Sequence, residues 1–122
     1  MECVVLVVED DPIVRLGAIE IVEGLGCMAF EAQNADEAVR VLEAHPEITL
    51  LFTDIDMPGT MDGLELAEVV HSRWPDKRLI VTSGHAVIPN ENLPDDGKFV
   101  TKPYYPGAVR AAIRQSIDHC AS

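Results

Sequence analysis

Two apolar runs of the chain each stop at carboxylates, and these acids are the first residues whose chemistry the sequence suggests. Val4–Val8 is followed by Glu9, Asp10 and Asp11, and a second run leads to Asp54. A short, wholly apolar run that ends in acids is typical of a buried parallel strand whose carboxyl end carries a site. Because several carboxylates gathered at neighbouring strand ends need compensation, we expect a cation there.

Two further apolar runs end at a lysine and at a hydroxyl. Lys102 follows the run at 99–101, and Ser83 ends the run that begins at 79. Phosphoryl transfer to a carboxylate needs a nucleophile, a divalent cation and fixed donors around the transferred oxygens. Asp54 is therefore the candidate nucleophile, with Lys102 as the cationic donor and Ser83 as the hydroxyl donor.

The acidic cluster also offers oxygen ligands for Mg²⁺, which binds few protein groups and keeps several waters. We expect Asp10 to ligate the ion directly beside Asp54, Glu9 to act through water, and Asp56 to lend its backbone carbonyl. A solvated turn with a helix cap is the ordinary interpretation of such a cluster. It suffices for Asp11 but is weak for the other two acids, because the preceding strand is wholly apolar.

Alternating strands and helices must bring these residues together. We expect helices at 12–24, 35–45, 62–74 and 106–119, and strands at 3–8, 28–32, 48–53, 78–82 and 98–101. This alternation predicts an α/β fold, a doubly wound parallel sheet with helices on both faces. The flavodoxin-like strand order 2-1-3-4-5 would place the ends of the first and third strands side by side.

Residues 85–96 form the irregular part of the pattern. Pro89 and Pro94 interrupt the helix that the fold would place there, so we expect a short turn of helix or a loop. No repeat, linker or low-complexity segment divides the chain. We therefore expect one domain over 1–122, without an attached output domain.

The composition bounds the function. The chain has 122 residues, of which 48% are apolar, so it can form a globular core, and its net charge of -12 argues against direct nucleic-acid binding. The three cysteines, Cys3, Cys27 and Cys120, lack metal-type spacing; Cys3 and Cys27 lie in apolar strand contexts, so we expect them to be buried free thiols, and a reducing cytosol fits this. No run approaches the roughly 20 residues of a membrane span, so we expect a cytoplasmic protein without membrane insertion.

Four motifs together closely resemble the receiver domain of two-component response regulators: VVEDDP (7–12), LFTDIDMPGTMDG (51–63), VTSGH (81–85) and FVTKPY (99–104). The resemblance covers the whole chain. It implies Mg²⁺-dependent transfer of a phosphoryl group to Asp54 from a sensor histidine kinase or a histidine phosphotransfer protein. It also implies that Ser83 and Phe99 switch inward together. The surface at 83–105 would then change for a downstream protein target or for phosphorelay.

The resemblance is not complete, and two other functions compete with it. The turn after Asp54 carries an extra residue around 59–60, the stretch from Ser83 to Lys102 is short, and Phe99 lacks a phenolic hydroxyl. Asp54 and Asp56 also resemble the nucleophile motif of haloacid-dehalogenase-type phosphatases, although that motif normally lies on the first strand of a longer chain. A pseudo-receiver that binds partners without phosphorylation would be expected if a core residue were missing, and none is.

Overall fold

The computed structural model describes residues 3–55, 63–84, 97–102 and 105–121, which form a five-stranded sheet and four helices. All strand pairs are parallel, in the order β2-β1-β3-β4-β5, which confirms the predicted topology. The strands are β1 (Val4–Val8), β2 (Met28–Ala32), β3 (Leu50–Asp54), β4 (Arg78–Ser83) and β5 (Lys98–Thr101). The helices are α1 (Pro12–Gly24), α2 (Ala35–Ala44), α3 (Gly63–Arg73) and α4 (Pro106–Ala121).

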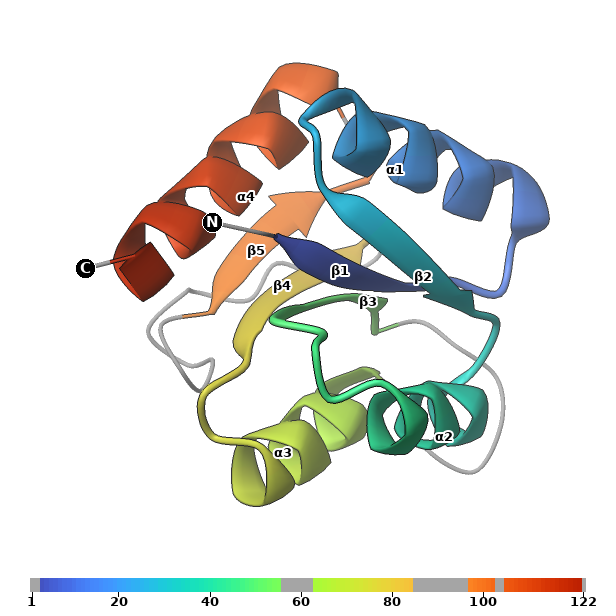
Figure 1. Ribbon diagram of the computed structural model, residues 1–122. Helices are drawn as coiled ribbons and strands as arrows, with labels where there is room; N and C mark the ends of the chain where they lie inside the picture. The colour runs from blue at the N-terminus through green and yellow to red at the C-terminus, as the bar shows by residue number, and fades with distance from the viewer. Residues whose placement is uncertain (1–2, 56–62, 85–96, 103–104, 122) are drawn as a thin grey trace.

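The sheet forms the middle of three layers (Figure 1). Helices α1 and α4 cover one face, and α2 and α3 cover the other. Every residue of β1 and β3 is buried, as expected for central strands covered on both faces, whereas the edge strand β2 is partly exposed. The register pairs Val8 with Thr53, so the two carboxyl ends that carry the acids lie side by side.

Local signals in the sequence explain where the helices begin. The Asp11 side chain accepts hydrogen bonds from the backbone N–H groups of Ile13 and Val14, and Pro12 occupies the first turn of α1. The Asn34 side chain caps α2 in the same way: its Oδ1 accepts a hydrogen bond from the Glu37 N–H at 2.8 Å. Asp11 and Asn34 therefore cap the two helices that the sequence predicted to begin at residues 12 and 35.

Two apolar cores form, one on each face of the sheet. The buried apolar residues of the other helices belong to these cores: Ala35, Ala38 and Leu42 of α2, Leu66, Ala67 and Val70 of α3, and Val109, Ala112 and Ile113 of α4. Helix α1 differs slightly: its buried residues are Ala18 and Val22, while Ile21 and Leu25 are only partly buried against the same core.

The observed boundaries agree with the predicted ones to within two residues. β3 begins at Leu50 and includes Asp54, and β4 extends to Ser83, so two candidate site residues are the last residues of their strands. The irregular segment expected at 85–96 lies outside the described residues. Within the described part of the chain, every helix falls short of the length and hydrophobicity that crossing a membrane requires.

Candidate functional site

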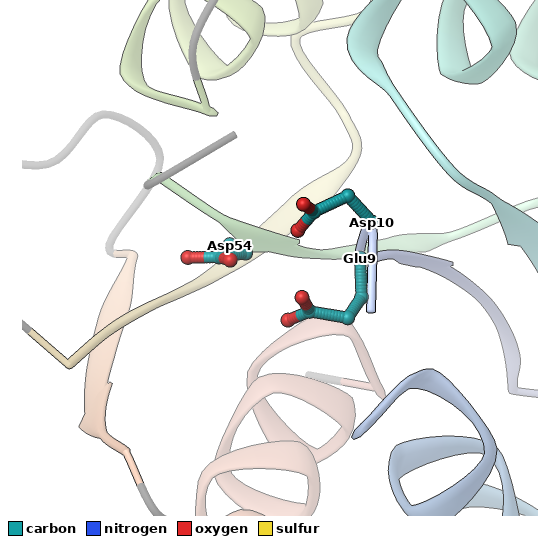
Figure 2. Close-up of side chains that lie close together, drawn as sticks. All are labelled: Glu9, Asp10 and Asp54. Carbon is teal, nitrogen blue, oxygen red and sulfur yellow. The ribbon is translucent and has the colours of Figure 1, made fainter. Parts of the chain in front are cut away.

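The three candidate acids meet at the carboxyl ends of β1 and β3. One carboxylate oxygen from each of Glu9, Asp10 and Asp54 lies within 4.8 Å of the others (Figure 2). Glu9 and Asp54 are almost fully buried, at 1% and 2% exposure, whereas Asp10 is exposed. Two acids are therefore held in a poorly hydrated pocket, and the third faces solvent at its rim.

Lys102 supplies the positive charge of this cluster. Its Nζ lies 2.7 Å from Asp54 Oδ2 and 2.7 Å from Glu9 Oε2. Its backbone N–H donates to the Ser83 carbonyl at 3.0 Å, which ties the residue after β5 to the end of β4. The lysine predicted as a cationic donor thus contacts two acids from two different strands.

The electrostatics of Glu9 follow from its burial. Burial raises the pKa of this carboxyl above its ordinary value, and the negative charge of Asp54 acts in the same direction. Two contacts act in the opposite direction and lower the pKa of Glu9: the contact with Lys102, and the hydrogen bond that the Asp11 N–H donates to Glu9 Oε1 at 3.2 Å. Burial is the largest of these effects, so the pocket holds the charge of Glu9 at a cost.

The donor set fits a hard divalent cation. Three carboxylates, when ionised, carry three negative charges, and the one ammonium of Lys102 leaves two of them uncompensated. Carboxylate oxygens are the ligands that Mg²⁺ and similar ions prefer. Glu9, Asp10 and Asp54 could hold such an ion, while Asp56, the fourth expected ligand, lies outside the described residues.

Arg15 is a supporting residue that the sequence did not suggest. Its guanidinium donates to the Glu9 backbone carbonyl at 2.8 Å and to Glu31 Oε1 on β2 at 2.9 Å. The side chain therefore connects α1 and β2 to the turn that carries the acids. Its position, one turn after the helix cap, was the only signal in the sequence that could have placed it there.

The two predicted switch residues lie on adjacent strands and on the same face of the sheet. The register pairs Val81 with Phe99 and Ser83 with Thr101. Val81 and Phe99 both pack in the core on the α2 and α3 side, and Ser83 shares that face because side chains alternate along a strand. Ser83 is fully buried and Phe99 is partly buried, an arrangement compatible with a coupled movement.

Comparisons with known proteins agree with this geometry. The family model described as response regulator receiver domain matches residues 5–114. The response regulator receiver protein CpdR of Brucella abortus (strain 2308) is 33% identical over 104 residues, which cover 83% of this chain and 85% of that protein. The sensor kinase CckA of the same organism is 30% identical over 118 residues; these cover 93% of this chain but only 12% of the kinase.

Solved structures share the fold. A CheY-like response regulator receiver domain protein from Methanospirillum hungatei JF-1 superposes with a TM-score of 0.83 at 26% identity, covering 99% of this chain and 98% of that one. The signal receiver domain of an HD domain-containing protein from Pseudomonas fluorescens Pf-5 gives a TM-score of 0.88 at 21% identity, covering 99% and 98%. All the described site residues fall within the matched part of the chain.

Proposed function

The chain belongs to the response regulator receiver domain family, and we propose that it is a phosphoacceptor whose Asp54 takes a phosphoryl group. The donor would be the phosphohistidine of a sensor kinase or of a histidine phosphotransfer protein. The observation that carries the proposal is the contact of Asp54 with Lys102. It lies at the edge of the sheet where two more carboxylates, those of Glu9 and Asp10, come close to Asp54. A buried carboxylate beside a fixed ammonium is well placed to receive a negatively charged group.

Each residue of the cluster has a role in this proposal. An Asp54 carboxylate oxygen attacks phosphorus, and the bond from phosphorus to the histidine nitrogen breaks, leaving the imidazole as the leaving group. The Lys102 ammonium balances charge on a phosphoryl oxygen, and the Ser83 hydroxyl donates a hydrogen bond to another. The protein would thus catalyse only its own phosphorylation and dephosphorylation.

A divalent cation completes the proposed chemistry. Mg²⁺ would be held by Glu9, Asp10 and Asp54 with the backbone carbonyl of Asp56, and when bound it neutralises charge on the phosphoryl oxygens. Lys102 is shared between Glu9 and Asp54. If Glu9 helped to hold a cation, the Lys102 ammonium would be less engaged with Glu9 and could contact the incoming phosphoryl group.

Signalling would follow from the switch residues. In the proposed phosphorylated state, Ser83 moves toward the phosphoryl oxygen and Phe99 fills the space it leaves, which changes the surface at 83–105. Such a two-state packing change is biased by the new contact to one oxygen. The surface would then recognise a downstream protein or pass the phosphoryl group onward.

Incubation with acetyl phosphate and Mg²⁺ tests the proposal, with the phosphorylated fraction separated on a phosphate-affinity gel. We expect a retarded band for the parent protein and none for Asp54→Asn. A parent protein that stays unmodified while its Mg²⁺ affinity is intact would favour a binding module without phosphorylation. Repeated turnover of p-nitrophenyl phosphate would favour the phosphatase alternative.

A further inference from the structure

Cys3 and Cys27 lie next to each other at the amino ends of β1 and β2. The ladder between these strands pairs Val4 with Met28, and the Met28 N–H donates to the Cys3 carbonyl at 2.9 Å. The two cysteines are therefore the next pair in the register. Neighbouring strands lie about 4.8 Å apart, and this falls within the roughly 4.4–6.8 Å between Cα atoms that a disulfide spans.

Both thiols lie on the same face of the sheet. Cys27 belongs to the apolar core on the α1 and α4 side, and Cys3 packs against that core. Val5 and Ala29, two residues further along each strand, contact the same core, as the alternation of side chains requires. The two sulfur atoms therefore lie on the same face of the sheet.

Solvent reaches this pair through a surface hollow of about 320 Å³. Its walls include Cys3, Val4, Gly26, Cys27 and Met28. Cys3 is partly exposed, whereas only 8% of Cys27 is accessible. The Cys3 thiol can therefore meet a small reagent in solution. The Cys27 thiol, which lines the same hollow, can then react with the product formed on Cys3.

We propose that Cys3 and Cys27 form a redox-modifiable dithiol that low-molecular-weight disulfides convert to an intramolecular disulfide. The Cys3 thiolate attacks one sulfur of the small disulfide, which releases one small thiol and leaves a mixed disulfide on Cys3. The Cys27 thiolate then attacks the Cys3 sulfur and releases the second small thiol. Two protein thiols are oxidised and one small disulfide is reduced to two thiols, so atoms and electrons balance.

The position of the pair favours ring closure. Cys3 and Cys27 directly precede the paired residues Val4–Val8 and Met28–Ala32, and the bond from the Met28 N–H to the Cys3 carbonyl holds the two strands together at this end. Gly26, directly before Cys27, has a φ of +83°, and this marks a turn between α1 and β2. The proposal is independent of phosphorylation, because the pair lies at the amino ends of the strands, opposite to the acids.

The test uses the full chain with Cys120→Ser, which removes the third thiol from the count. The native protein is treated with glutathione disulfide, denatured, and analysed by thiol titration and intact mass. We expect the loss of two thiols and a mass decrease of about 2 Da, both reversed by dithiothreitol. Adding Cys3→Ser or Cys27→Ala to this background should abolish the decrease.

Three outcomes would overturn the proposal: thiols that stay unmodified in the native protein, a glutathione adduct that never closes, and a disulfide-linked dimer on a non-reducing gel. Peptide mapping of the oxidised Cys120→Ser protein decides the matter even when a double variant does not fold. A cross-linked peptide pair that contains residues 3 and 27 supports the assignment. Its absence from an oxidised monomer contradicts it.

Discussion

The Nζ of Lys102 lies 2.7 Å from Oδ2 of Asp54, although 48 residues separate them in the chain. The same ammonium contacts Glu9, which is at the end of a different strand. One cation thus compensates two almost fully buried carboxylates, and it does so from a side chain that is itself 21% exposed.

Replacing Lys102 by methionine should destabilise the metal-free protein. The substitution removes the ammonium that contacts two buried carboxylates, and we expect the free energy of unfolding to fall by about 2–3 kcal/mol, less than for a fully buried pair because the lysine is partly exposed. Urea unfolding in EDTA measures this. The matched control is Lys98→Met, because Lys98 is a half-buried lysine on β5. An equal loss of unfolding free energy in that variant would speak against a special role of Lys102.

Asp10→Asn should raise the thermal midpoint of the metal-free protein. Removing one of three acids whose oxygens lie within 4.8 Å relieves repulsion between like charges. Mg²⁺ should stabilise the parent by mass action and the variant less. Asp11→Asn serves as control, since asparagine also caps helices well. A lower midpoint for Asp10→Asn than for the parent in EDTA would argue against a packed acidic pocket.

Because of Lys77, the free energy of unfolding should increase with pH in the alkaline range. Its buried ammonium donates to the backbone carbonyls of Pro46 and Ile48, and burial lowers its pKa, with Glu47 partly opposing. Between the lowered pKa and the ordinary value of 10.5, the folded protein binds fewer protons than the unfolded chain, so stability rises with pH.

The comparison of the parent with Lys77→Met isolates this effect. The difference in unfolding free energy, parent minus variant, should increase as the pH rises toward the ordinary lysine pKa of 10.5 and should level off above it. Lys98→Met, measured against the parent in the same way, controls for the loss of one positive charge. A difference for Lys77→Met that stays flat or falls over this range would disagree with the burial of its charge.

Phosphorylation should change hydrogen exchange at 83–105 and leave α2 nearly unchanged. Ser83 and Phe99 lie on one face of adjacent strands, so a shift of one requires repacking by the other. Beryllofluoride, which imitates the phosphoryl group on an aspartate, supplies the trigger. Exchange is compared with and without it in the parent and in Asp54→Asn. Changes restricted to α2, with 83–105 silent, would contradict this description of signalling.

The convergence of Asp54 and Lys102 could be predicted because each is at the end of an apolar run, and parallel strands bring their carboxyl ends to one edge of the sheet. The roles of Arg15 and Lys77 could not. Both residues donate hydrogen bonds through long side chains to backbone carbonyls in other segments of the chain, and the periodic pattern of apolar residues does not predict such contacts.

The sharing of Lys102 between Glu9 and Asp54 also escaped prediction. The sequence indicated that the lysine would contact a phosphoryl group, but the metal-free geometry depends on how far β5 extends beside β4. The Lys102 N–H bound to the Ser83 carbonyl sets that alignment. Strand ends could thus be predicted from the sequence to within two residues, whereas the partner of each charge could not.

Intact mass spectrometry after incubation with acetyl phosphate tests the central claim most directly. With Mg²⁺, we predict an addition of about 80 Da to the parent and to Asp11→Asn, the mass of one phosphoryl group. We predict no addition to Asp54→Asn, and none to the parent in EDTA. An adduct that persists in Asp54→Asn, or that forms equally well in EDTA, would contradict both the assignment of the phosphoacceptor and the need for a divalent cation.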